Sequence, residues 1–132
     1  MEWKYIKKLN DEKNIGEFEE LAKVRLQEDY KNFIKDYNGG RPSKKAFKTE
    51  KGVEHLVKTF LSYNKEDKEN IFKAYEYGHD FFDESYFAIG NDPFGNYILS
   101  DKKGRIYYFD LESGKIEFIE NSFEKFINSL YD

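Results

Sequence analysis

The strongest pattern of hydrophobic and polar positions lies in residues 88–110, where two apolar runs are separated by two turns. The runs Tyr97–Leu99 and Ile106–Phe109 are rich in aromatic and β-branched residues, which favour strands. The breaks at Asn91–Asn96 and Asp101–Gly104 contain residues that form tight turns. The pattern predicts antiparallel strands joined by short turns, at the centre of a sheet.

Further strand patterns lie on both sides of this stretch. Tyr86–Ile89 precedes it, and Lys115–Ile119 alternates well enough for a strand with one exposed face. The segment Ala46–Leu61 is ambiguous, because its apolar residues recur at helical spacing while its composition favours strand. The residues alone leave helix and strand open there.

Apolar residues at helical spacing predict two helices near the start of the chain. The first covers Ile15–Val24, with Asn14 as its N-cap and Glu17 completing a capping box. The second covers Glu28–Tyr37, whose apolar positions form one stripe. The glycines that follow Asn38 end this helix through a left-handed C-cap.

Two more helices are expected later in the chain. One runs through Ile71–Gly78. The other follows Asn121, which caps it together with Glu124, and its apolar face includes Phe123 and Phe126. Loops between the elements are short and no internal repeat or linker is evident. With 132 residues, of which 19% are aromatic, the chain is expected to fold as one domain around large rings.

The charge pattern limits the classes of partner. The net charge is −4, and no Lys or Arg lies between Lys73 and Lys102, which disfavours a nucleic-acid partner. The chain has no cysteine, which excludes disulfides and cysteine-based zinc sites. It has neither a signal peptide nor an apolar run of about 20 residues, so we expect a cytoplasmic protein without a membrane partner.

Two groups of polar residues could carry chemistry, but a simpler interpretation is preferred for each. Asp92, Asp101 and Asp110 could form a metal cluster, yet they lack EF-hand spacing and are expected to hold turns. His55 and His79 lie in neither a nucleophile elbow nor a metalloprotease motif. We therefore expect no catalytic residue, no metal site and no cofactor.

An aromatic group on the predicted sheet could stack nucleic-acid bases. Tyr107 and Phe109 share one face of a strand, while Tyr108 takes the other, and Tyr97 lies on the neighbouring strand. Base-stacking platforms need many surrounding Lys and Arg residues, and only three lie close in sequence. These aromatic residues are therefore assigned to the core of the sheet.

Five segments in order resemble the SUKH superfamily, which includes bacterial immunity proteins and fungal cell-wall regulators. They are FEEL, LQEDYKNFIKDYNGG, AIGNDPFGNYILSD, GRIYYFDLES and SFEKFINSL. Together with the helix that contains FEEL, they span Ile15 to Leu130. One departure is Leu26-Gln27, where the family usually has Leu-Pro. The positions that look fold-defining in the family are Gly39, Gly40, Asp92, Gly95, Asn96, Asp110, Phe123 and Phe126.

The resemblance implies a single α+β domain over residues 1–132. Its mainly antiparallel sheet is flanked by N-terminal helices and a C-terminal helix, and it favours strand in Ala46–Leu61. It also implies function by binding: bacterial members act as antidotes that block a cognate protein toxin, often a nuclease. The alternative is a non-catalytic regulatory scaffold, as the fungal members suggest. The oligomeric state is left open.

An acidic and aromatic segment, Tyr75–Glu84, is the expected contact surface for the toxin. A nuclease cleft is positive because it holds phosphates, so an inhibitor with carboxylates and rings would compete for it. The alternative is a solvated loop in which Phe81 and Phe82 belong to the core. The candidate contact residues are Tyr75, Glu76, Tyr77, Asp80, Phe82, Asp83 and Glu84.

Overall fold

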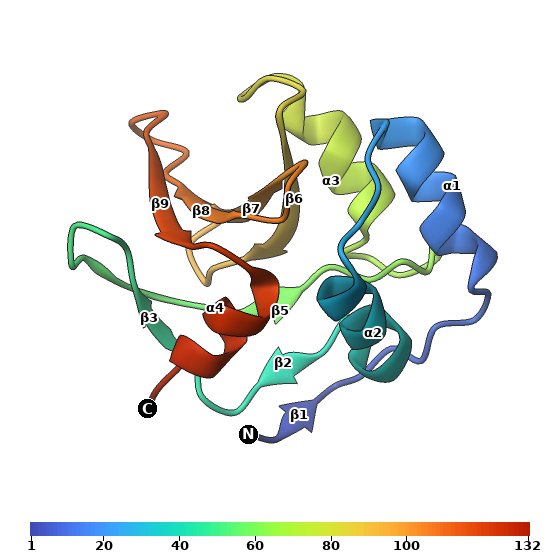
Figure 1. Cartoon of the computed structure of the whole chain (residues 1–132), viewed down its shortest axis with the longest axis horizontal. Coiled ribbons are helices and arrows are strands. Elements are labelled where there is room, and N and C mark those ends of the chain that lie inside the picture. Colours follow the sequence, from blue (N-terminus) through green and yellow to red (C-terminus); the bar gives the residue numbers. More distant parts are fainter.

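The computed structural model describes all residues from 1 to 132 and shows one α+β domain with four helices and nine strands. The elements are β1 Trp3–Lys4, α1 Lys13–Ala22, α2 Glu28–Tyr37, β2 Arg41–Pro42, β3 Ala46–Lys48, β4 Glu54–Leu56, β5 Thr59–Phe60, α3 Ile71–Gly78, β6 Tyr86–Asn91, β7 Tyr97–Asp101, β8 Ile106–Phe109, β9 Ile116–Glu120 and α4 Phe123–Ser129. Figure 1 shows α1 beside α3 next to β6, and α2 beside α4.

A five-stranded antiparallel sheet in the order β5-β6-β7-β8-β9 forms the centre of the fold. The stretch 88–110 supplies most of β6 and all of β7 and β8, which confirms the central position predicted for it. Tyr97 pairs with Phe109 and Leu99 pairs with Tyr107. Directly opposed residues share a face, so Tyr107 and Phe109 lie on one face and Tyr108 on the other, as expected.

The ambiguous segment 46–61 forms β3, β4 and β5, so the expectation of strand is confirmed. The apolar residues of this segment that recur at helical spacing are not all buried. Val53 and Leu56 are 46% and 40% exposed, whereas Val57 and Phe60 are buried. A helix with all four on one side would bury them together. Pairing of β3 with β4 and of β5 with β6 satisfies the backbone instead.

The predicted helices are present, but two predicted caps are wrong. Asn14 lies inside α1, where its side chain donates a 3.0 Å hydrogen bond to the carbonyl of Tyr63. The last helix is capped by Ser122 rather than Asn121, and its hydroxyl accepts from the N–H of Lys125. Residue Glu12 at the start of α1 makes no side-chain capping bond, whereas two adjacent polar residues could cap the last helix by sequence and Ser122 does so.

The core lies on both faces of the sheet. On one face, rings from α1, α2 and α4 interlock with the sheet; for example, Phe18 packs edge-on against Phe87 of β6 at 5.5 Å. On the opposite face, the connection from α3 to β6 places Phe82 against Tyr97 and Phe109. Large rings therefore fill the core, as the aromatic content predicts.

Candidate protein-interaction surface

The predicted contact segment consists of α3 and its connection to β6. Asn70 caps α3 by accepting a 2.9 Å hydrogen bond from the N–H of Lys73. The helix ends at Gly78, whose carbonyl accepts from the N–H groups of both Phe81 and Phe82. A Cβ at Gly78 would lie 2.6 Å from the Phe82 ring. This close approach folds the connection back over the sheet.

Five of the seven predicted contact residues lie at the surface. The carboxylates of Glu76, Asp80, Asp83 and Glu84 are on exposed residues, and Tyr77 is 52% exposed. None of these four carboxylates forms an ion pair within 4.0 Å. They are therefore available to a partner.

The other two predicted residues have structural contacts. Tyr75 packs edge-on against Phe18 with ring centroids 5.6 Å apart, and Phe82 packs against Phe109 at 5.3 Å. Phe81, left out of the prediction, is 38% exposed and pairs with Tyr77 at 5.1 Å. Two adjacent phenylalanines look alike in sequence, and only the turn after Gly78 decides which one faces solvent.

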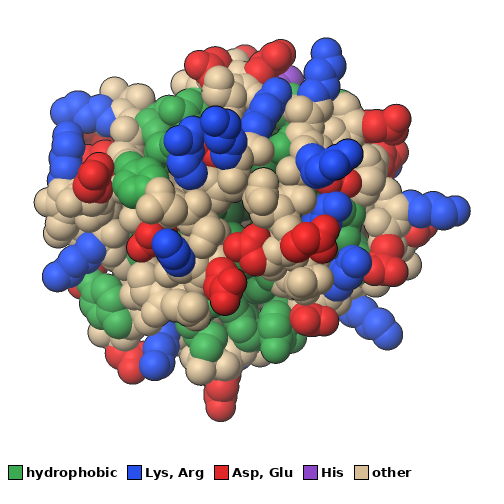
Figure 2. Space-filling view, viewed as in Figure 1, with side chains coloured by type: hydrophobic (Ala, Val, Ile, Leu, Met, Phe, Trp, Pro, Cys, Tyr) green, Lys and Arg blue, Asp and Glu red, His purple; other side chains and the backbone are tan.

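Basic residues far away in sequence lie next to the acidic connection in space. Asp83 and Glu84 share an open hollow of about 590 Å³ with Lys102, Lys103 and Arg105 of the β7–β8 turn. Figure 2 shows carboxylates at the top of the molecule, over the α3–β6 connection, with Lys and Arg side chains below them. The charge of the surface is therefore mixed around Asp83 and Glu84, which the sequence does not reveal.

The floor of this hollow is held by Asp101. Its carboxylate accepts hydrogen bonds from the N–H groups of Lys103 and Arg105, from Arg105 Nε and from the Tyr107 hydroxyl. Burial by itself would raise the pKa of Asp101, but these hydrogen bonds outweigh it and keep the pKa below its usual value. The backbone of the turn and the side chain of Arg105 are therefore firmly held.

The three aspartates considered as a metal cluster act as turn residues on three separate hairpins. Asp92 holds the β6–β7 turn, Asp101 the β7–β8 turn and Asp110 the β8–β9 turn through hydrogen bonds from N–H groups of the same turn. No group of three or more His, Asp or Glu side chains is arranged to hold a metal ion. The preferred interpretation of Asp92 is thus confirmed.

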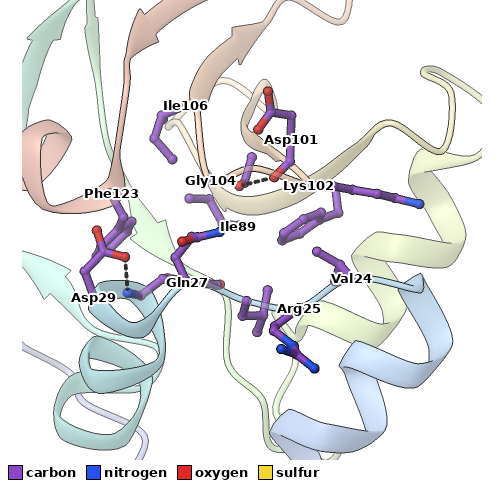
Figure 3. Close-up of a pocket in the computed structure, with 14 residues that line it drawn as sticks. Val24, Arg25, Gln27, Asp29, Ile89, Asp101, Lys102, Gly104, Ile106 and Phe123 are labelled. Carbon is purple, nitrogen blue, oxygen red and sulfur yellow. Dashed lines mark hydrogen bonds between the residues drawn. The ribbon is translucent and has the colours of Figure 1, made fainter.

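A small pocket lies between the α1–α2 loop and the sheet (Figure 3). Its free space is about 10 Å³, room for at most a single water molecule. Gly104 lies against Gln27 here, because a Cβ at Gly104 would come within 2.7 Å of Gln27 Cγ. This space is a small gap where two loops pack against each other, and it is too small for a substrate.

The two histidines contact aromatic rings. His55 stacks on Tyr108 with centroids 3.7 Å apart, at a hollow of about 160 Å³ that also contains Asp110 and Glu117. His79 lies edge-on to Tyr75. Neither imidazole hydrogen-bonds to a carboxylate, and the Tyr108 hydroxyl is occupied by Asp92. The arrangement of nucleophile, His base and orienting carboxylate that covalent catalysis uses is therefore not assembled at either histidine.

Comparison with known families finds one match over most of the chain. The family model described as SMI1-KNR4 cell-wall (SUKH_6) matches residues 12–127. The match includes the three aspartate turns, α2 and most of α4. No curated protein matches the chain, and none of its helices is both long and apolar enough to cross a membrane.

Proposed function

The chain belongs to the SMI1-KNR4 family of the SUKH superfamily, and on that basis we propose that it is an immunity protein. It binds one cognate toxin domain and blocks it by occlusion, without carrying out a reaction. The observation that carries this proposal is the family match over residues 12–127. The absence of an assembled acid–base pair is compatible with it.

The proposed contact surface is the acidic end of α3 and the connection that follows. Glu76 and Asp80 present unpaired carboxylates beside the exposed ring pair Tyr77 and Phe81. The aromatic rings provide apolar area that loses water on binding, and the carboxylates attract a positively charged partner as it approaches. A nuclease toxin fits this combination, because its cleft is positive where it holds phosphates. The encounter would take place in the cytoplasm, where a delivered nuclease finds its substrate.

Co-expression with the toxin encoded by the neighbouring gene tests the proposal. The wild-type chain is expected to restore growth and to form a stable complex with an inactive form of that toxin in size-exclusion chromatography. Val57→Asp, which places a carboxylate at a fully buried position, serves as the unfolded control and should not restore growth. A folded wild-type chain that neither restores growth nor forms the complex would overturn the proposal.

A regulatory scaffold is the second candidate, favoured by the cell-wall description of the matching family. Such a module would use the same exposed surface to assemble other proteins of the cell. Affinity purification separates the two functions: a scaffold recovers housekeeping proteins from cells that carry no toxin gene, whereas an immunity protein recovers its toxin.

A further inference from the structure

The most exposed large hydrophobic side chain of the molecule is Phe94, at the tip of the β6–β7 turn. It is 82% exposed, compared with 68% for Tyr5 and 52% for Tyr77. A ring in this position gains almost nothing from folding, because it stays in water. The turn itself needs only its Asp, Gly and Asn residues. The structure thus gives Phe94 no role within the domain.

The turn that carries Phe94 is rigidly held. Asp92 is 3% exposed, and its carboxylate accepts 2.8 Å hydrogen bonds from the N–H groups of Phe94 and Asn96. It also accepts from the Asn96 side chain and from the hydroxyl of Tyr108. Gly95, with φ of 89°, adopts the left-handed conformation that the turn requires. The backbone under the exposed ring is therefore fixed before any partner arrives.

A second exposed apolar residue is tied to the same turn. The Asn96 side-chain oxygen accepts a 2.9 Å hydrogen bond from the N–H of Leu111, in the β8–β9 turn. Leu111 is 37% exposed. Its own turn is held by Asp110, which accepts from Glu112 N–H and the Ser113 hydroxyl. Two hairpin tips are thus joined into one platform that presents Phe94 and Leu111.

We propose that Phe94, supported by Leu111, is an apolar anchor that inserts into a pocket of the toxin. This inference rests on the proposed function and adds a contact outside the acidic segment. Interface hot spots are enriched in large anchoring side chains, and a preorganised backbone reduces the entropy that is lost on binding. Phe94 supplies the large side chain, and the hydrogen bonds of the buried Asp92 carboxylate hold the backbone of its turn in place.

The charges around the tip indicate the chemistry of the pocket. The β6–β7 turn contains no basic residue, and Leu111 lies between Asp110 and Glu112. The nearest basic residue of the adjacent turn, Lys115, lines a hollow with Asp110 and Glu117. The matching site is therefore an apolar pocket with a basic rim. A symmetric dimer through this tip would instead bring the carboxylates of two copies together.

The dissociation constant for the inactive toxin of the neighbouring gene tests the anchor. Phe94→Ser is expected to weaken binding about 30-fold, mainly through faster dissociation, because a desolvated hot spot is lost. Its thermal midpoint should equal that of the wild type, since the side chain is exposed. The matched control is Leu21→Ser, which removes an apolar side chain that is 52% exposed on α1, and which should bind like the wild type.

The outcomes separate the anchor from the proposed function. If the wild type binds the toxin and Phe94→Ser binds equally well, the anchor is wrong and the immunity function stands. If the folded wild type does not bind, both are overturned. Light scattering completes the test: a wild-type dimer that Phe94→Ser converts to a monomer would assign the tip to self-association and overturn the toxin anchor.

Discussion

The hydroxyl of Tyr108, on β8, donates a 2.7 Å hydrogen bond to the carboxylate of Asp92, in the β6–β7 turn. The two residues are 16 positions apart, and the bond ties the sheet to the β6–β7 turn. Tyr108 is 4% exposed and Asp92 3% exposed. Burial and the neighbouring carboxylate raise the pKa of Tyr108, so its hydroxyl remains a donor at physiological pH.

Removing this hydrogen bond should lower stability. Tyr108→Phe is expected to reduce the free energy of unfolding by about 2 kcal/mol, because a buried charged acceptor loses a donor. Asp92→Ala should cost about 3 kcal/mol or more, since it leaves two backbone N–H groups without an acceptor. Urea denaturation measures both. Tyr97→Phe is the matched control: its hydroxyl makes no hydrogen bond, so an equal loss there would contradict the assignment.

Stability should fall at acidic pH through the turn aspartates. Burial by itself raises the pKa of Asp92, but its hydrogen bonds outweigh burial and keep the pKa below the ordinary value. A depressed pKa stabilises the fold above the unfolded value of about 3.9, and this stabilisation is lost as pH falls through the folded value. The Asp92→Asn variant should therefore lose less stability than the wild type as the pH is lowered from about 5 through the folded pKa. The difference between the two losses should correspond to the protonation of one carboxylate, and thermal unfolding at each pH measures it. An unchanged pH profile would argue against the depressed pKa.

Gly78 is expected to resist substitution although it lies in a helix. Alanine normally stabilises a helix relative to glycine by about 1 kcal/mol. A Cβ at Gly78 would instead meet the Phe82 ring at 2.6 Å, so Gly78→Ala should lower the free energy of unfolding by about 2 kcal/mol through overpacking. In the double variant with Phe82→Leu the two losses should be less than additive. Strict additivity in the denaturation data would show that the two residues do not interact.

Reversing the acidic residues Asp80, Asp83 and Glu84 to Lys should slow association with a basic toxin about tenfold at low salt and remove the salt dependence of the rate. Stopped-flow mixing measures the association rate. The control triple variant reverses Glu20, Asp36 and Glu50, which are exposed elsewhere and unpaired, and produces the same change in net charge. If both triple variants slow association equally, the effect comes from net charge and not from this surface.

The cations beside Asp83 and Glu84 give an opposite expectation. Lys102 and Lys103 line the same hollow, so replacing both with Ser should make the surface more negative and speed association with a basic toxin at low salt. Neither side chain forms an ion pair within 4.0 Å, so the thermal midpoint should stay unchanged. A slower rate would place Lys102 and Lys103 in the interface themselves.

Local chemistry explains why much of the fold is predictable. The helix Glu28–Tyr37 has the predicted bounds, and Gly39 follows it with φ of 67°. Asp92, Gly95 and Asn96 form the predicted turn because the carboxylate accepts from N–H groups two and four residues later. These features depend on residues that are close in sequence. The residues themselves therefore specify them.

Contacts between distant residues explain what could not be predicted. Asn14 is drawn from its expected cap by the Tyr63 carbonyl, 49 residues away. Phe81 is exposed and Phe82 packed because the latter meets Gly78, Tyr97 and Phe109 together. A single sequence contains no signal for either choice.

The sequence by itself determined the four helices, the strands β6 to β9 and the turns held by Asp92 and Asp101, because each depends on residues close in sequence. The order of five short segments also carried the family resemblance. Only the tertiary structure decided which charges and rings share a surface. It brought Lys102 and Lys103 beside Asp83 and Glu84, and it joined Phe94 to Leu111 through Asn96. The physical reason is that successive turns of an antiparallel sheet alternate between its two ends. The β6–β7 and β8–β9 turns therefore share one end, and the β7–β8 turn lies at the other end beside the connection into β6.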